Sequence, residues 1–558
     1  MRHVTDPDAS PPQAAEDTFV LTDRQIKVAM SGLLLGMFLA ALDQTIVSTA
    51  LRTIANHLHG GADQAWVTTA YLVGGTVAVP FYGKLSDIYG RKPLYLAATG
   101  IFLLGSVASG CANSMAMLAV CRAAQGLGGA GLMSLPMAII ADMVPLRDRG
   151  RYMAHLTMTW VAASVIGPLA GGAFAGAHTL LGISGWRWAF LVNLPLGLLA
   201  VATVSKALTL PQRHRSHRLD YWGAAWIVVA VVPLLVVVEQ GSAWGWASAR
   251  AGVTYAVTAV GVALFVVREQ RMGEEAMLPL KLFRRGGITV GALVNLTLGV
   301  SIFGTTVGLP LYLQLVRGKT PTQSGLLLIP FLLGTVASQM ATGKIIKKTG
   351  RIKALAVVGV GSMASALLLF ATMGVSTPMW EVGVLAVWIG LGTGISQTVI
   401  VLAIQNAVPK SELGVANGAG VLFRQLGGSL GTALFLSVML GVAASRINSL
   451  VYGPRTSAFH RALAHAQAAR TPGDRAFLDR VPTGGRGIDL NSTAFLAHMD
   501  PRLAQPVLEG FATGFRYMFF CGGIVLTLGF VLVWWIKELV HEDEPVPAAP
   551  TAEPAEQH

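Results

Sequence analysis

Apolar runs of about 18 to 26 residues recur along the whole chain, and they restrict the fold more than any other feature. A run of this length crosses the ~30 Å hydrocarbon core of a bilayer as one α-helix. Lipid offers no partners to backbone polar groups, so a spanning segment is either a helix or part of a closed barrel, whose strands are only ~10 residues long. With 53% hydrophobic and 12% charged residues, the sequence predicts an all-α integral membrane protein.

The sequence predicts fourteen membrane helices, separated by short polar loops. Their ranges are 28–51, 65–86, 95–112, 116–141, 152–175, 189–208, 221–239, 251–267, 287–308, 322–342, 353–373, 380–405, 415–443 and 511–536. Residues 1–27 form a polar tail without a cleavable signal pattern, so we expect the first helix to act as an uncleaved anchor. Residues 537–558 are acidic and rich in Pro and Ala, which predicts a disordered tail.

The net charge of +13 follows the loops rather than a single surface. Basic residues such as Arg91, Arg149, Arg215 and Lys348 lie in alternate loops, and the loops between them carry few. Because Lys and Arg collect on the cytoplasmic side of a membrane, this pattern predicts that both termini are cytoplasmic. It also disfavours nucleic acid as the partner. The abundance of Arg, Ala and Gly suggests a bacterial source, and hence the bacterial inner (plasma) membrane.

The chain contains an internal repeat. The segments 83–91 and 343–351 share a Gly-Lys start and a Gly-Arg end, and they lie 260 residues apart. The sequence therefore predicts two six-helix bundles in the same orientation, residues 28–208 and 287–536, with two inserted helices within residues 209–286.

The outer loop 446–510 lies outside this repeat and is polar. Two interpretations stay open: a solvated cap, or a docking surface for a periplasmic adaptor protein.

Asp43 is the only acid deep inside the first apolar run. An ionised Asp at a bilayer centre costs at least ~2.5–3.5 kcal/mol, so such a residue usually has a function there, and proton transport suits its chemistry. Arg122 lies at a similar depth in the fourth helix and could pair with it. If substrate separated the pair, Asp43 would shift toward protonation. The alternatives are a structural hydrogen bond for Asp43 and a static ion pair or backbone clamp for Arg122.

Two further groups of residues indicate moving parts. Gly83, Asp87, Gly90 and Arg91 predict an inner latch: the glycines permit a tight turn, Asp87 can accept hydrogen bonds from a facing helix N-terminus, and Arg91 can pair across the loop. The alternative is a basic loop that only sets topology. The second group is a predicted hinge in the fifth helix, made of Gly167, Pro168, Gly171 and Gly172, where proline kinks a membrane helix and glycines allow close packing. Packing alone is the alternative.

These motifs resemble those of the major facilitator superfamily, and of its fourteen-helix drug:proton antiporters, the QacA/EmrB-like group. The resemblance rests on residues 83–93, 42–47, 122–129, 167–172 and 186–195, and it covers nearly the whole chain. It implies the fold of that superfamily and the export of drugs in exchange for protons. By resemblance, Arg122 takes part in proton transfer, and Gly167 with Pro168 bends the fifth helix to favour export.

Side chains expected to line a substrate cavity share a polar or aromatic character within the predicted helices: Gln44, Gln125, Trp160, Glu239, Phe303 and Arg424. Arg424 could orient substrate or lock the two halves. The repeat places Phe303 where Asp43 stands, so proton coupling is expected in the first half alone. The sequence shows no nucleotide, metal or catalytic motif, which predicts a transporter without cofactors, driven by the proton gradient.

We therefore expect a multidrug efflux antiporter that works by alternating access between the bundles. Its expected substrates are neutral lipophiles and monovalent cations, because one buried acid suits dications poorly. Two alternatives remain: a dedicated exporter of an endogenous metabolite, lipid or antibiotic, and a non-transporting membrane receptor. The oligomeric state stays open.

Overall fold

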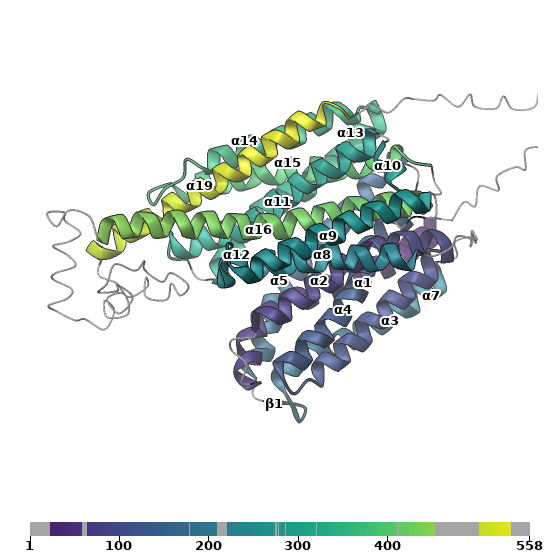
Figure 1. Ribbon diagram of the computed structural model, residues 1–558, viewed down its shortest axis with the longest axis horizontal. Helices are drawn as coiled ribbons and strands as arrows, with labels where there is room; N and C mark the ends of the chain where they lie inside the picture. Colours follow the sequence, from purple (N-terminus) through teal and green to yellow (C-terminus); the bar gives the residue numbers. More distant parts are fainter. Residues whose placement is uncertain are drawn as a thin grey trace, which may run out of the picture.

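The computed structural model describes residues 23–58, 64–144, 146–177, 179–208, 220–273, 276, 278–284, 286–319, 321–409, 412–451 and 501–536. Nearly all of these residues are helical, and the helices run roughly along one long axis (Figure 1). The prediction of an all-α protein is confirmed for this part of the chain.

The helices fall into three groups along the chain. The first comprises α1 (Asp23–His57), α2 (Gln64–Tyr89), α3 (Arg91–Gly110), α4 (Met115–Met143), α5 (Leu146–Gly176), α6 (Trp188–Leu191) and α7 (Asn193–Ala207). A short hairpin of β1 (Thr179–Leu180) and β2 (Ile183–Ser184) lies between α5 and α6, with Thr179 opposite Ser184. The inserted group comprises α8 (Tyr221–Trp244), α9 (Ala249–Met272) and α10 (Leu280–Arg284). The last comprises α11 (Gly286–Leu315), α12 (Pro321–Leu326), α13 (Ile329–Thr349), α14 (Ile352–Phe370), α15 (Met379–Asn406), α16 (Leu413–Val451) and α19 (Pro501–Val533).

Thirteen helical segments in the described ranges are long and apolar enough to cross a membrane. The predicted span 65–86 is not among these thirteen. It corresponds to α2, which is equally long but carries Lys84 and Asp87 near its end and does not reach the same hydropathy. It packs against α4, which is one of the thirteen. Exposed aromatic side chains at helix ends, among them Trp222 and Trp535, suit the interface of a bilayer. The chain is a multi-pass membrane protein.

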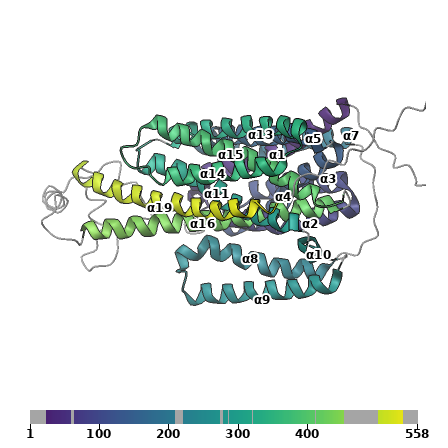
Figure 2. The ribbon, with the colours of Figure 1, turned by 90° about the horizontal axis from the view of Figure 1, so that it is seen from above.

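The two halves use the same packing pattern. In the first half α1 packs on α5 and α7, and α4 packs on α2 and α3. In the second half α11 packs on α16 and α19, and α15 packs on α13 and α14. The helix pairs correspond one to one, as the 260-residue repeat predicts. The hairpin of α8 and α9 lies beside the two halves (Figure 2), with α8 against α2 and α16.

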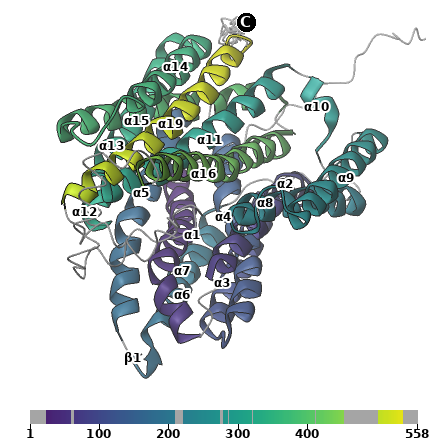
Figure 3. The ribbon, with the colours of Figure 1, turned by 60° about the vertical axis from the view of Figure 1, so that its left-hand side comes forward.

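The two ends of the molecule differ. One end carries Asp87, Arg91 and the first turn of α16, and is called the latch end below. The other carries β1, which Figure 3 shows at the foot of the first half, far from α10. In Figure 1 the two halves diverge toward the β1 end and lie together at the latch end.

Several predicted boundaries were wrong. The expected outer loop 446–510 is shorter, because α16 continues to Val451 and α19 begins at Pro501. Buried residues of both extensions, such as Ile447 and Val507, belong to one apolar cluster. Residues 23–27, expected in the tail, belong to α1. Residues 240–244, expected as loop, belong to α8, so Glu239 lies inside a helix rather than at its end.

Two predicted helices are interrupted. The sixth expected helix is divided at Val192 into α6 and α7, and the tenth is divided into α12 and α13. Residues 452–500, 209–219, 1–22 and 537–558, and with them most of the expected loop and both tails, lie outside the described residues.

Candidate functional site

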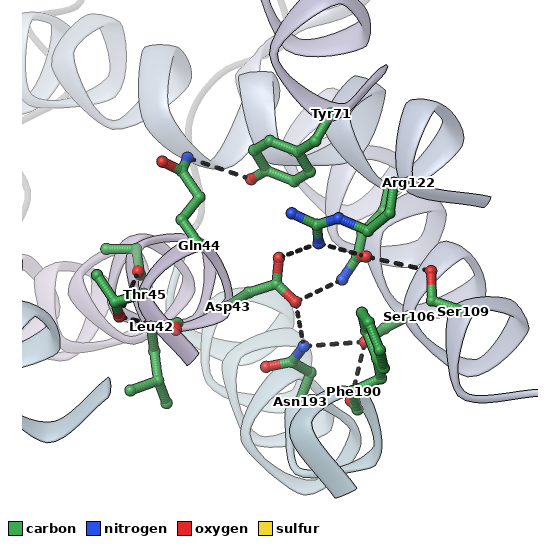
Figure 4. A network of polar contacts seen from close by, with 12 residues as sticks. Leu42, Asp43, Gln44, Thr45, Tyr71, Ser106, Ser109, Arg122, Phe190 and Asn193 are labelled. Atoms are coloured by element: carbon green, nitrogen blue, oxygen red, sulfur yellow. Dashed lines mark hydrogen bonds and ion pairs between the residues drawn. The ribbon is translucent and has the colours of Figure 1, made fainter. Parts of the chain in front are cut away.

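Asp43 lies at the centre of a buried polar network between α1, α4 and α7 (Figure 4). Its Oδ2 accepts a hydrogen bond from Arg122 Nη1 at 2.5 Å, and its Oδ1 accepts from Gln125 Nε2 and Asn193 Nδ2, both at 2.8 Å. Asp43 is fully buried and Arg122 is 3% exposed. The structure therefore places the two predicted charges in direct contact, with two amide donors around the same carboxylate.

A second layer of contacts positions the residues around Asp43. The guanidinium of Arg122 stacks over the ring of Tyr71, 4.1 Å from its centroid, and its Nη1 also donates to Gln125 Oε1 at 2.8 Å. Asn193 Nδ2 donates in addition to Ser106 Oγ at 2.9 Å. The side chains of Arg122 and Asn193 are thus each held by a contact with a neighbouring helix. A buried ion pair needs such contacts, since they offset part of its desolvation.

Glycines in α4 bring the neighbouring helices close enough for this network. A Cβ at Gly126 would overlap the backbone of Tyr71 in α2, and one at Gly128 would overlap the backbone of Ala98 and Phe102 in α3. Small residues allow membrane helices to approach closely. The Gly-rich run in α4 is therefore a packing surface that holds Tyr71 beside Arg122.

Sequence reasoning missed Asn193, Tyr71 and Ser106 as members of the site. Asn193 is fully buried at the first position of α7, directly after the break that divides the sixth helix. An amide at a helix break inside an apolar segment is a usable signal, because buried polar groups need partners. Tyr71 and Ser106 carry no comparable signal, since both residue types are common in membrane helices.

The inner latch joins the two halves at the latch end. Asp87 Oδ2 accepts a hydrogen bond from the backbone N–H of Val415 in the first turn of α16 at 3.0 Å, and Arg91 Nη1 lies 2.6 Å from Asp87 Oδ1. Val415 is one of the N–H groups that α16 leaves unpaired, so Asp87 accepts at a facing helix N-terminus, which is the contact that the sequence suggests. A further acid, Asp142 at the end of α4, binds Arg91 Nε at 2.8 Å and was not predicted.

The two latch glycines have different roles. Gly90 has φ 92°, a conformation that glycine adopts freely, and it makes the tight turn between α2 and α3. Gly350, which lies 260 residues later, has φ 66° at the equivalent turn. Gly83, expected in the turn, lies inside α2 instead, where a Cβ would sit 2.7 Å from the carbonyl oxygen of Gly414. It lets α2 and α16 touch through their backbones.

A second bridge between the halves lies beside the latch. Arg149 in α5 donates from Nη1 to Gln405 Oε1 of α15 at 2.7 Å, and Gln405 Nε2 donates to Asn417 Oδ1 of α16 at 3.1 Å. Arg149 also donates to the carbonyls of Ala141 and Val144 at the end of α4. Burial lowers the pKa of Arg149 to about 10, so it is still charged at neutral pH. We call this chain of residues the Arg149 bridge.

The glycines of the predicted hinge pack α5 against α1. A Cβ at Gly167 would meet Thr45 Cβ at 2.5 Å, and one at Gly171 would meet the carbonyl oxygen of Ile46 at 2.7 Å. The α5 helix runs without interruption through Pro168. A Cβ at Gly172 meets nothing within 4 Å. Gly167 and Gly171 therefore pack closely against α1. The residues that they meet, Thr45 and Ile46, lie two and three positions after Asp43.

The α5 glycines allow a matched stability test. Gly167→Ala is expected to lower the free energy of unfolding by about 1–3 kcal/mol, because the added methyl group overlaps Thr45. Gly172→Ala is expected to leave it unchanged or slightly raised, since alanine favours a helix more than glycine does. Thermal unfolding of both variants in the same detergent measures the difference. Equal melting temperatures would mean that α1 and α5 do not pack this closely.

The residues expected around a substrate cavity have different positions. Gln44 Nε2 donates to Tyr71 OH at 3.5 Å and so borders the Asp43 network, while Gln125 belongs to it directly. Trp160 is half-buried against the apolar clusters of the first half, which favours a packing role. Arg424 lines a small cavity that also touches α4 and α15. The side chains of Glu239 and Phe303 lie outside the described residues.

Comparison with known proteins identifies the family. The model of the Major Facilitator Superfamily matches residues 33–432. The tetracycline resistance determinant of Streptomyces rimosus is 50% identical over 59% of this chain and 94% of its own length, and the multidrug transporter protein MdtP of Bacillus subtilis is 29% identical over 91% and 93%. Among solved structures, the proton:xylose symporter XylE shares the fold, with a TM-score of 0.58 at 14% identity over 93% of this chain and 97% of its own. The chain belongs to the Major Facilitator Superfamily, and it is a membrane transporter rather than an enzyme.

Proposed function

We propose that this transporter exports lipophilic drugs in exchange for protons. The observation that carries the proposal is the fully buried Asp43, paired at 2.5 Å with Arg122 inside the membrane. Intramembrane acids of this kind commonly belong to proton relays. The similarity to proteins named for tetracycline resistance and multidrug transport supports drugs as the substrate class.

Asp43 would carry the proton. In the described conformation its carboxylate is stabilised by one cation and two amide donors. If movement of α4 or α7 withdraws these donors, the buried charge loses its compensation and the protonated form becomes favoured. A conformational change that separates Asp43 from Arg122 would therefore take up a proton, and its reversal would release one.

The inner latch and the Arg149 bridge would control access from the latch end. Both connect the first half to α15 or α16, so both must break when the halves separate at that end. Asp87 and Arg149 are charged, and water can solvate them once the end opens. This makes their separation reversible, as alternating access requires.

The proposed orientation places the latch end in the cytoplasm of a bacterial cell, with the transporter in its plasma membrane. Basic residues gather at this end, including Lys84, Arg91, Lys348 and Arg351. Their excess on one side follows the rule that Lys and Arg remain on the cytoplasmic side. The proton gradient, directed inward across this membrane, would then drive export.

Transport by the purified full chain in liposomes tests the proposal. We expect the ethidium cation to accumulate when a pH gradient is imposed, and the accumulation to stop when nigericin collapses that gradient. Addition of ATP should change nothing. Protein-free liposomes provide the control for passive entry. Equal accumulation with and without the gradient would exclude proton coupling, and no accumulation above the control would exclude drug transport.

A further inference from the structure

Arg424 is a second cation within the membrane part of the molecule, and its surroundings differ from those of Arg122. It lies eleven residues after the start of α16 at Leu413, or about 16 Å along the helix axis. Among the described residues it has no ion pair and no hydrogen-bond partner. A charge in a low-dielectric interior is costly without a partner. The half-buried guanidinium of Arg424 therefore has donors that no described residue engages.

The side chain of Arg424 borders a small cavity between the two halves. Met137 of α4 contributes from the first half, while Asn295 of α11 and Asn417 of α16 contribute from the second. Val401 and Ile404 of α15 complete an apolar wall. The cavity thus lies where alternating access would place a substrate, at the interface that opens and closes.

The described residues that line the cavity include several hydrogen-bond donors and no acid. Asn417 Nδ2 is buried and binds none of the described residues, although Asn417 Oδ1 accepts from Gln405. Asn295 is 3% exposed, and its Nδ2 points toward the space beside Gly420, 3.2 Å from where a Cβ would lie. An orphaned buried donor is costly and calls for an acceptor. Together, a free guanidinium and two amides fit an anionic, acceptor-rich group.

We infer that Arg424, Asn417 and Asn295 form a subsite that binds the anionic group of an amphiphilic organic acid during transport. This inference rests on the proposed export function and specifies its substrate class. It extends the expected cationic and neutral substrates to anionic amphiphiles. Because Asp43 is fully buried and already holds three donors, the charged group of such a substrate would bind at Arg424 instead. The cavity is small in this conformation, and its apolar wall would meet the remainder of an amphiphile once the two halves separate.

The subsite also touches the Arg149 bridge. Asn417 accepts from Gln405 through Oδ1 and faces the cavity with Nδ2, so one side chain belongs to both. An anion bound to Nδ2 would favour the same amide orientation that lets Oδ1 accept from Gln405. Occupancy of the subsite and closure of the latch end are thereby linked through a single residue.

Binding of a matched pair of probes tests the subsite. The probes are 11-dansylaminoundecanoic acid and its methyl ester, titrated by dansyl fluorescence against the purified full chain in zwitterionic nanodiscs, with empty nanodiscs subtracted. We expect the acid to bind at least about tenfold more tightly than the ester, equivalent to about 1.4 kcal/mol. Arg424→Gln should reduce the preference to within about twofold by weakening the acid alone. Arg424→Lys should keep part of it, because the charge remains without the planar fork.

Arg250→Gln serves as the matched control, because Arg250 is exposed at the start of α9. It should bind both probes as the unchanged protein does. Equal binding of acid and ester by the unchanged protein would overturn the inference, as would a preference that survives Arg424→Gln. An Arg424-dependent rise in thermal stability with chloride, without preference for the acid, would assign the position to an inorganic ion and also overturn it. Because binding is measured without a gradient, a failed ethidium experiment would reject proton-driven drug export while leaving this result standing.

Discussion

Asp43→Asn is expected to reduce ethidium accumulation under an imposed pH gradient to the level of protein-free liposomes. The amide cannot bind or release a proton in this pH range, so the variant has no proton to exchange for the drug. The variant also leaves Arg122 buried without its counter-charge. Breaking a buried ion pair in this way lowers the free energy of unfolding by about 3–5 kcal/mol. Proteoliposome transport and thermal unfolding of the same preparation measure both effects.

Two further variants separate the loss of coupling from the loss of stability. The double variant Asp43→Asn, Arg122→Gln removes both charges and is expected to recover most of the stability while transport remains absent. Glu509→Gln removes an exposed acid on α19 and should transport as the unchanged protein does. Gradient-driven exchange by a folded Asp43→Asn variant would show that the proton travels elsewhere.

Gly83→Ala is expected to reduce transport about tenfold by preventing closure of the latch end. The new Cβ would lie 2.7 Å from the carbonyl oxygen of Gly414, which belongs to the backbone and cannot rotate away. Overpacking of this kind costs about 1–3 kcal/mol, and about 1.4 kcal/mol already changes the ratio of closed to open molecules tenfold. Spin labels at Tyr89 and Lys348, both exposed and one in each half, should report longer distances in the variant.

Gly100→Ala is the control for the latch variant. Gly100 lies in α3, and a Cβ there meets nothing within 4 Å, so both the distance distribution and the transport rate should match those of the unchanged protein. An unchanged distance distribution in Gly83→Ala would show that α2 and α16 do not need backbone contact to close.

The sequence predicted the membrane helices and their duplication because both can be recognised from the order of residues alone. Apolar runs of spanning length and a motif repeated after 260 residues are properties of the chain alone, and the corresponding helix pairs do pack alike in the two halves. The sequence predicted that α16 ends too early and that α19 begins too late. The two extensions pack on each other, since a Cβ at Gly510 would meet Ile447, and a local hydropathy pattern does not show such a contact.

The sequence predicted the charged residues of the candidate site. Asp43, Arg122, Asp87 and Arg91 are costly to bury, so each one signals a partner. The partners Asn193 and Asp142 were missed for a different reason: an amide in an apolar segment and an acid at a helix end fit many environments. Which neutral residue meets which charge depends on helix rotation, and rotation is set by packing across the whole bundle.

The amide of Asn193 gives the Asp43 site a property that a simple ion pair lacks. Its nitrogen faces the carboxylate, while its buried oxygen has no partner in the described residues. Three N–H groups donate to the Asp43 carboxylate. Once protonated, the carboxyl group would itself become a donor and would need an acceptor in place of one of them. Half a turn of the Asn193 amide would supply that acceptor. The Asn193 amide on α7 would therefore point one way when Asp43 is charged and the opposite way when it is neutral. A change of charge at Asp43 would in this way alter the contacts of α7.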